Sequence, residues 1–319
     1  MRIPIERVQE VIERTLGRTP LTVDDQRIVA HALLDAECTG RSGHGLNRLP
    51  AILDWATSGG SERIVLTRDQ GSTLSVDGGG VLGILVAHRA AVLACERLAH
   101  QPFVAIGCRN CRHTNAIGYF ARIVAEEGHV AIAATHCSPL LAPHDGHAPV
   151  FGTNPLALAC PGPTGPIVAD VSPARVTYGS LINAKLNGEA IEPGAAIGPD
   201  GNPTTDAAEA LRGAMLPIAE HKGTALAFLV QVLAGSLVGA SAVPGALDEF
   251  GFFLAAFRTD AFGDAGQFES GMAELTRRVH DAGGQCPGEG STRRRAHAQD
   301  EGVDVDPGVW KAVQALVAD

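Results

Sequence analysis

The sequence has little basic charge. Its 319 residues include 25 Lys and Arg against 35 Asp and Glu, a net charge of −10, and Arg293-Arg294-Arg295 is the basic run that stands out. A nucleic-acid duplex or an anionic membrane surface binds a basic face, so neither is an expected partner. Three neighbouring arginines more often form a solvated or ion-paired loop than a nucleic-acid site.

The sequence shows no obvious membrane span and no paired set of cysteines, and we expect no secretory leader. The N-terminal stretch MRIPIERVQEVIER is charged throughout, which is untypical of a signal peptide. The most apolar stretch, Ala225 to Ala242, is interrupted by Gln231, serines and glycines, so it predicts a buried core helix rather than a span. Seven scattered cysteines are typical of reduced thiols. We therefore expect a cytoplasmic protein that does not bind membranes.

What remains is an ordinary globular composition, 45% hydrophobic and 19% charged. Apolar residues recur at helical spacing at Ile5, Val8, Ile12 and Leu16, with Gly17 as a stop. Thr22, with Asp25 three residues later, predicts the start of a second helix. A third helix is expected to carry Leu49, Ile52 and Leu53 and to end before Gly59-Gly60.

Beyond residue 70 the pattern changes to alternating strands and helices. We expect strands at Thr73–Val76, Phe103–Gly107, Val130–Thr135, Leu156–Cys160, Ile167–Asp170 and Phe252–Ala256, and helices at Ile84–Ala99, Ile117–Glu127, Thr224–Leu237 and Gly266–Ala282. This alternation predicts an α/β or mixed α+β body. Residues 285–306 are polar and turn-rich, and a short last helix is expected at Pro307–Val317. We divide the chain into a helical region 1–70, a central body 71–284 and a C-terminal segment 285–319.

The motif Gly78-x-Gly80-x-x-Gly83 follows a strand and opens a helix, the context of a dinucleotide fingerprint. The next strand ends at Gly107-Cys108-Arg109, without the acidic residue that would complete the fingerprint. An ordinary glycine turn before a helix is therefore the favoured interpretation.

Two other motifs also have a structural explanation. Cys108-x-x-Cys111 has no second cysteine pair and no zinc-type spacing to His113, so core thiols are favoured. The run His144-Asp145-Gly146-His147 predicts a solvated turn rather than a metal site.

Clusters of polar residues in glycine-rich turns are more informative. They are Ser42-Gly43-His44-Gly45 with Arg48, His113-Thr114-Asn115, Gly152-Thr153-Asn154-Pro155, Asp170 at a strand end, and His221-Lys222-Gly223 at a helix start. Strand ends and helix starts are where α/β proteins build their sites. One such cluster is ordinary turn chemistry, but five in one chain indicate a functional site.

These clusters lie in blocks that resemble the malate/L-lactate dehydrogenase-like family of NAD(P)-dependent oxidoreductases, which is unrelated to the Rossmann-type lactate dehydrogenases. The blocks are TGRSGHGLNRLP (39–50), HTNAIGYFARIVAEEG (113–128), THCSPLLAPHDG (135–146), FGTNPLALACP (151–161), residues 200–235, CPGEG (286–290) and GVDVDPGVW (302–310). The resemblance keeps its order over nearly the whole chain. The family also includes ureidoglycolate dehydrogenases, diketogulonate reductases and cyclic imino acid (piperideine/pyrroline-2-carboxylate) reductases.

The resemblance implies a non-Rossmann fold with a helical N-terminal part, joined by the C-terminal segment, and a central cofactor-binding α/β domain. It implies reduction of a 2-oxo acid to a 2-hydroxy acid, or of a cyclic imino acid to a cyclic amino acid, with NADPH or NADH. A small-molecule carboxylate is the implied substrate, a homodimer the implied assembly, and no metal is implied.

The resemblance also implies catalytic roles for four residues. His44 matches the catalytic histidine, whose ordinary pKa of about 6.5 suits proton transfer near neutral pH. Asp170 matches a strand-end aspartate that would orient His44 or favour its charged, protonated form. Arg48 would bind the substrate carboxylate, and His113 matches a second active-site histidine.

Other positions are implied to bind the cofactor or to line the substrate. On the cofactor side are Thr153, Asn154, Pro155, Ser172, His221, Lys222 and Gly223, and on the substrate side are Ser42, Ile52 and His136. The chain departs from the family pattern in several places: Gly43 stands for a serine, Ile52 for a tyrosine, Thr114-Asn115 for Phe-Gly, His136 for an asparagine, Pro173-Ala174 for Thr-Ser, Ala195 for a tryptophan and Ala219-Glu220 for Gly-Gly. An altered lining indicates a substrate other than standard malate or lactate.

Two other classes remain as alternatives. The departures allow a repurposed, non-catalytic binding protein on the same scaffold. A metal-dependent hydrolase would need His44, His113, His136 and His147 to converge on one ion, and their spacing gives no sign of that.

Overall fold

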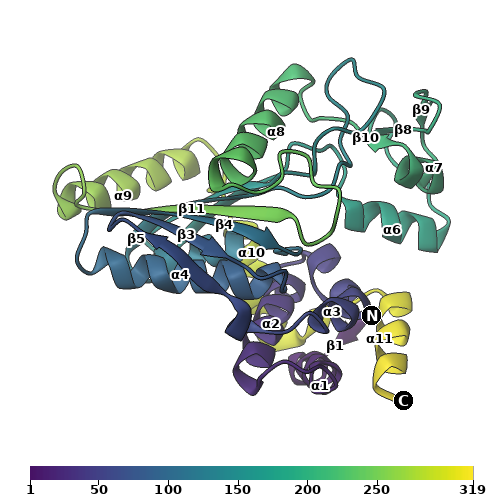
Figure 1. Cartoon of the computed structure of the whole chain (residues 1–319), viewed down its shortest axis with the longest axis horizontal. Helices are drawn as coiled ribbons and strands as arrows, with labels where there is room; N and C mark the ends of the chain where they lie inside the picture. The colour runs from purple at the N-terminus through teal and green to yellow at the C-terminus, as the bar shows by residue number, and fades with distance from the viewer. Residues whose placement is uncertain (319) are drawn as a thin grey trace.

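A mixed seven-stranded sheet forms the centre of the computed structural model, which describes residues 1–318 (Figure 1). Its strands, in the order β2-β3-β4-β11-β5-β6-β7, are Val65–Asp69, Thr73–Asp77, Phe103–Cys111, Phe250–Arg258, His129–Thr135, Leu156–Cys160 and Ile167–Val171. Strands β3 and β4 run parallel and the other neighbouring pairs run antiparallel. The predicted mixed α/β class is confirmed, and β2 is a strand that the sequence pattern did not predict.

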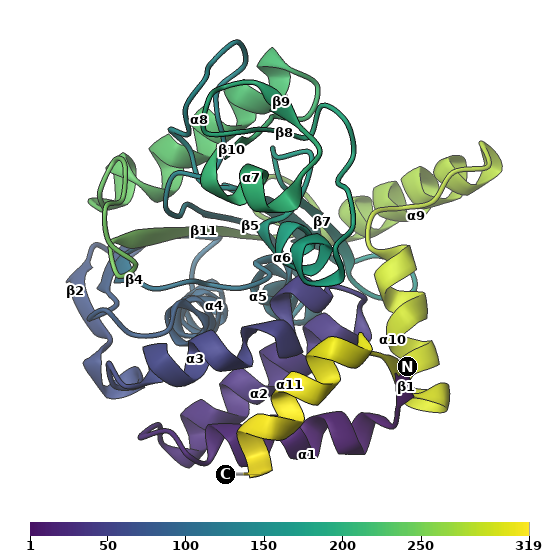
Figure 2. The same ribbon diagram turned by 90° about the vertical axis from the view of Figure 1, so that its right-hand side faces the viewer.

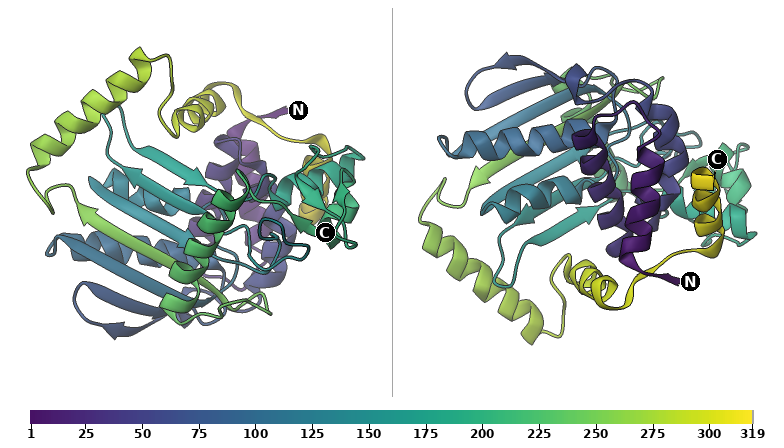
Figure 3. Two further views of the ribbon diagram at one scale, coloured as in Figure 1. Left: turned by 90° about the horizontal axis from the view of Figure 1, so that it is seen from above. Right: turned by 90° about the horizontal axis from the view of Figure 1, so that it is seen from below.

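Helices cover both faces of this sheet. Helices α4 (Gly83–Leu98) and α5 (Gly118–Glu126) lie on one face, and α8 (His221–Ala234) crosses the other (Figures 1 and 3). Phe120 of α5 and Phe252 of β11 are both fully buried and meet edge to face, with ring centroids 6.3 Å apart. Each aromatic ring removes a large apolar area from water, so this contact anchors α5 on the sheet.

The glycines 78, 80 and 83 form the turn between β3 and α4. A side chain on Gly83 would place its Cβ 2.2 Å from the Arg112 carbonyl oxygen, and Gly80 has a positive φ of 73°. These glycines therefore let the turn adopt a positive φ and pack closely against the backbone near Arg112, as expected of an ordinary glycine turn before a helix.

The N-terminal helices α1 (Ile5–Leu16), α2 (Val23–Cys38) and α3 (Leu49–Ala56) form the expected helical region. The Thr22 hydroxyl accepts a hydrogen bond from the Asp25 N–H at 3.2 Å and so caps α2. Helix α11 (Pro307–Ala318) lies across these helices (Figure 2), and β12 (Val303–Asp304) pairs with β1 (Arg2–Ile3). The C-terminal segment thus returns to the N-terminal region.

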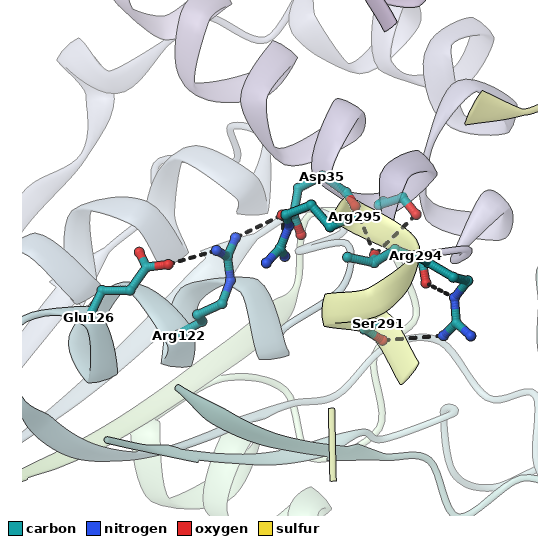
Figure 4. A network of polar contacts seen from close by, with 8 residues as sticks. Asp35, Arg122, Glu126, Ser291, Arg294 and Arg295 are labelled. Atoms are coloured by element: carbon teal, nitrogen blue, oxygen red, sulfur yellow. Dashed lines mark hydrogen bonds and ion pairs between the residues drawn. The ribbon is translucent and has the colours of Figure 1, made fainter. Parts of the chain in front are cut away.

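The expectation of an irregular segment at 285–306 is wrong, because helix α10 (Glu289–Glu301) lies within it. Asp35 accepts hydrogen bonds from Arg295 at 2.6 Å and from Arg122 of α5 at 2.8 Å, and Arg294 donates to the Thr39 carbonyl at 2.8 Å (Figure 4). This polar network stabilises helix α10. Its sequence has few apolar residues, so no helical hydrophobic pattern predicts it.

A small lobe beside the sheet was not predicted. It contains α6 (Tyr178–Asn187), α7 (Ala207–Arg212) and the short strands β8 (Ala196–Ile197), β9 (Pro203–Thr204) and β10 (Ala214–Met215), around an apolar cluster of its own. The two-residue strands are too short to give an alternating pattern. The lobe places the start of α6 opposite the N-terminal helices (Figure 2).

The expectation that residues 225–242 form a buried core helix is also wrong. Val230 and Ala234 of α8 are buried against the sheet and Ala227 against the small lobe, but Phe228 and Leu229 on the outer side are 58% and 59% exposed. The segment His221–Val238 has the length and composition of a membrane span, with a mean hydropathy of 1.3, and 33% of it is buried. Helix α9 (Ala265–Asp281) likewise has no buried residue.

Candidate active site

One cavity of about 650 Å³ brings most of the predicted site residues together. It lies between the N-terminal helical region, the ends of the central strands and the start of α6. Its walls include Ser42, His44 and Arg48 from the turns before α3, His113 from the β4–α5 connection, Thr153 and Pro155 from the β5–β6 connection, and Asp170 and Ser172 at the end of β7. Its volume is within the range of small-molecule and cofactor sites.

His44 lies in the 3-10 helix Ser42–His44, and its ring centroid is 6.1 Å from that of His113. Burial, followed by the nearby cations Arg48 and Arg41, lowers the pKa of His44 to about 4, although the Asp170 carboxylate acts to raise it. The imidazole is therefore neutral at pH 7 and can accept a proton.

Arg48 is a cation without an anionic partner in residues 1–318. Its Nε donates to the Gly43 carbonyl at 2.8 Å, and its guanidinium lies 5.9 Å from the centre of the Tyr178 ring. Burial lowers the pKa of Arg48, which records the cost of desolvating a cation with no counter-charge. An anionic ligand would remove that cost.

Asp170 does not hydrogen-bond to His44. Its Oδ2 accepts from Arg41 and, at 3.1 Å, from the backbone N–H of Gly118. Asp170 therefore acts on His44 through its charge, and Arg41 holds that carboxylate in place. Arg41 was missed from the sequence, although it lies inside the recognised TGRSGHG segment.

His113 lies between His44 and Trp55, which stacks on it at a centroid distance of 6.0 Å. Its Nδ1 accepts from the Asn115 N–H at 2.9 Å, so the neutral ring carries its proton on Nε2. Burial lowers the pKa of His113 well below its ordinary value. His113 is thus a neutral hydrogen-bond donor beside His44. Trp55 is a further wall residue that sequence reasoning missed.

Two departures from the family pattern are explained by the backbone. Asn115, which replaces a glycine, has a φ of +69°, a conformation that asparagine tolerates better than most residues. Gly43, which replaces a serine, faces Gly179 of α6, and a Cβ on Gly43 would lie 3.3 Å from the Gly179 Cα. The loss of the serine side chain lets the small lobe approach residues 42–48, the turn that holds His44 and Arg48, closely.

Several predicted residues lie outside the cavity. Ile52 is buried in the main core, and His136 is buried with Nε2 2.8 Å from the Ser241 carbonyl and Nδ1 accepting from Gly251. Asn154 is fully buried and donates to the Ala227 carbonyl and to Gln231, at 3.0 and 2.6 Å. Ile52 and His136 are thus packed into the fold, and Asn154 ties its turn to α8.

The start of α8 also lies away from this cavity. His221 and Lys222 are exposed there, whereas Gly223 is buried and a Cβ on it would lie 2.2 Å from the Ile218 carbonyl oxygen. The two residues before them, Ala219 and Glu220, have positive φ values of 45° and 56°. Glycine adopts this backbone readily, which accounts for the Gly-Gly of the family pattern at these positions.

Glu37 of α2 contacts the backbone of the turn that holds His44 and Arg48. It is 4% exposed and accepts a hydrogen bond from the Leu46 N–H at 2.6 Å. A side chain on Gly45 would place its Cβ 2.3 Å from the Glu37 carboxylate. Burial raises the pKa of Glu37 to about 7. This acid therefore fixes the backbone between His44 and Arg48.

The remaining sequence motifs stay outside the site. Cys108 and Cys111 are buried free thiols whose pKa is raised by burial, and His144 and His147 lie in an exposed turn. The four histidines considered for a hydrolase metal do not converge within residues 1–318: His136 binds backbone and His147 is exposed.

The cavity residues fit a nicotinamide ring beside a small carboxylate. Asn115 lines the cavity, and its buried Oδ1 has no hydrogen-bond partner within the described residues. An N–H donor, such as a carboxamide, suits that oxygen, and an unpaired acceptor is otherwise costly to bury. Thr153, Pro155 and Ser172 line the wall implied for the cofactor.

Known proteins resemble this chain over nearly its whole length. The sequence profile of the malate/L-lactate dehydrogenase family matches residues 3–314. A malate/(S)-sulfolactate dehydrogenase from Methanothermus fervidus is 30% identical over 319 residues, covering 96% of this chain and 94% of that protein. A Delta(1)-pyrroline-2-carboxylate/Delta(1)-piperideine-2-carboxylate reductase from Pseudomonas putida is 30% identical over 321 residues, with the same coverage. The crystal structure of a dehydrogenase from Sinorhizobium meliloti superposes with a TM-score of 0.92 at 29% identity, covering 99% of this chain and 98% of that one.

Proposed function

This chain belongs to the malate/L-lactate dehydrogenase family of NAD(P)-dependent oxidoreductases, and we propose that it interconverts a monocarboxylic 2-oxo acid and its 2-hydroxy acid, or a cyclic imino acid and its cyclic amino acid. His44 is the proton donor and acceptor of this reaction. The observation that carries the proposal is the unpaired, partly buried guanidinium of Arg48 beside His44 in one cavity.

Arg48 binds the substrate carboxylate. Its planar guanidinium presents donors that match two carboxylate oxygens, and the bound anion supplies the missing counter-charge. The carboxylate also offsets the lowering effect of Arg48 on the pKa of His44. Substrate binding therefore moves the His44 pKa upward, toward the range where a histidine can donate a proton.

Thr153, Pro155 and Ser172 would hold a nicotinamide cofactor, which would supply hydride-transfer chemistry at the substrate C2. In reduction, His44 gives its proton to the forming alkoxide oxygen or amine nitrogen, and in oxidation it takes that proton back. With a 2-oxo acid, His113 also donates from Nε2 to the same oxygen, which has a second lone pair, and fixes its position. The Asp170 carboxylate stabilises the charged form of His44 through space.

The charge balance of the cavity favours a substrate with one acidic group. Among the described wall residues, Arg41 is paired with Asp170, the two histidines are neutral and Arg48 alone is an unpaired cation. The wall also contains Trp55, Tyr178 and Phe250. A second carboxylate or a sulfonate would meet no unpaired cation there, whereas an apolar or cyclic remainder would pack on the rings.

A substrate panel tests the proposal. Oxidation of NADH and NADPH would be followed with pyruvate, phenylpyruvate, oxaloacetate, 2-oxoglutarate and the five- and six-membered cyclic imino carboxylates. We expect turnover, with a monocarboxylate or cyclic imine preferred over the dicarboxylates. No turnover and no calorimetric binding of either dinucleotide, in folded protein, would favour the alternative of a repurposed binding protein.

We propose a cytoplasmic homodimer as the working form. The seven free cysteines support the reducing compartment. The outer side of α8 supports the dimer, because Phe228, Leu229 and Val232 are 58%, 59% and 43% exposed on one contiguous helix. Light scattering on a sizing column should give twice the chain mass, and Phe228→Asp should give the chain mass. A wild-type monomer at micromolar concentration would rule out the dimer.

A further inference from the structure

Three side chains of different chemistry converge where α9 meets α10. They lie outside the active-site cavity, in a neighbouring cavity that shares Arg41 and Ala116 with it. His280 ends α9, Cys286 lies in the connection and Glu289 begins α10, and their ligand atoms all lie within 4.8 Å of one another. We propose that His280, Cys286 and Glu289 form a zinc-binding site that joins the two helices.

The donor set suits zinc. An imidazole nitrogen, a thiolate and a carboxylate oxygen are the three ligand types that Zn²⁺ takes in proteins. A dication would also neutralise the thiolate and the carboxylate together. Calcium and magnesium prefer oxygen ligands only, so the thiol and the imidazole count against them.

The spacing of the atoms requires only a small adjustment. His280 Nε2 lies 2.5 Å from Glu289 Oε1, which is a hydrogen-bond distance. Tetrahedral coordination at ordinary Zn–N and Zn–O lengths places such atoms about 3.3 Å apart. The His280 side chain is 48% exposed and that of Glu289 is 28% exposed, so both are free to separate by that amount.

The connection between the helices holds Cys286 and Glu289 in place. Cys286 is 6% exposed, and Gly288 has a φ of +87°. A Cβ on Gly288 would lie 2.9 Å from the Val168 carbonyl oxygen, so the turn sits directly on β7. The His280–Glu289 ion pair accounts for two of the three residues, but it gives no reason for the thiol beside them.

The surroundings provide a fourth ligand position. The three residues line a cavity of about 400 Å³, which has room for a metal-bound water. Thr276, one helical turn before His280, lines the same cavity, and its buried Oγ1 has no partner among residues 1–318. Arg293 Nη1 lies 3.9 Å from Glu289 Oε2 and can steady the carboxylate from outside.

Metal titration of tag-free, metal-stripped full-length protein tests the site. Cadmium would be the probe, since a Cd–thiolate bond gives an ultraviolet charge-transfer band, and zinc would then compete it away. We expect one equivalent of Cd²⁺ per chain and loss of the band in Cys286→Ser. Cys95→Ser, which removes a partly buried free thiol on α4, should leave the band unchanged.

His280→Ala is a second variant, because Cys286→Ser changes a buried residue and could misfold. His280 is exposed, so its replacement leaves the buried connection intact. Loss of an outer-shell partner already costs about 10- to 100-fold in affinity, so loss of this direct ligand should weaken zinc binding by at least about 100-fold. Zinc should raise the melting temperature of the wild type but not of Cys286→Ser. No stoichiometric binding, or equal binding in Cys286→Ser or His280→Ala, would overturn the proposal. Both readouts are independent of catalysis.

Discussion

Glu37, which lies under the turn that holds His44 and Arg48, makes the stability of the fold depend on pH in a way that one substitution can isolate. Its pKa is about 7 in the folded chain, against an ordinary value of 4.5, because burial disfavours the carboxylate. The folded state therefore keeps this proton where the unfolded state has lost it. The stability that protonated Glu37 contributes to the folded state is fully present below about pH 4.5 and is lost as the pH rises through about 7. Above that, the free energy of unfolding no longer depends on this group.

The expected magnitude follows from the size of this shift. One pKa unit corresponds to about 1.36 kcal/mol, so the shift from 4.5 to about 7 corresponds to about 3 kcal/mol. Glu37 is 4% exposed, so solvent screening is small. Glu37→Gln keeps an oxygen that accepts from the Leu46 N–H and resembles the protonated acid, but it cannot ionise.

Urea unfolding at a series of pH values from about 4.5 to about 8 measures the effect. The free energy of unfolding of the wild type should fall by about 3 kcal/mol more than that of Glu37→Gln across this range. Histidines that titrate in the same window cancel in the comparison. Glu6→Gln, on the surface of α1, is the matched control and should follow the wild type. Parallel curves for wild type and Glu37→Gln would refute the reasoning.

Three further outcomes are expected. Arg48→Ala should lower kcat/KM by about 100-fold or more, because the hydrogen bonds to the substrate carboxylate are lost, and Arg48→Lys should recover part of it. Unchanged kinetics would contradict the role of Arg48 in binding the carboxylate. In the oxidation direction kcat/KM should rise with pH through about 4 as His44 becomes neutral and then level off, whereas a rise centred near 6.5 would contradict the buried imidazole. Glu220→Gly should stabilise the fold by about 1–2 kcal/mol in urea, because Glu220 has φ 56° and ψ −120°, and no gain would mean that the turn carries no strain.

The longer elements could be predicted from the sequence because each has its own local signal. Helix α1 follows from apolar spacing, and α2 from the Thr22 cap, which the structure confirms with a hydrogen bond to Asp25. The central strands were placed within a few residues of their observed bounds. Helix α10 could not be predicted this way, because contacts with Asp35 and Thr39, far away in sequence, stabilise it.

The residues of the site could be predicted where the chain keeps the sequence blocks of the family. His44, Arg48, His113 and Asp170 do line one cavity. Their interactions were not predictable, since the pairing of Asp170 with Arg41 depends on how the turn before α3 meets β7. The small lobe was missed, and with it the Tyr178 ring beside Arg48.

The solvent exposure of helix α8 could not be predicted from its composition. The apolar run at Ala225 to Ala242 predicts burial on all sides, but only one side of α8 meets the sheet. An apolar helix face can serve a core or a partner equally well, and a single sequence carries no signal that separates the two.

The most direct test of the proposed chemistry is His44→Ala, compared with the wild type for dinucleotide binding and for turnover of the best substrate from the panel. We predict that calorimetric binding of the dinucleotide is retained while turnover falls by about 100-fold or more, the contribution expected of a positioned proton donor. Full activity in His44→Ala would contradict the assignment of His44.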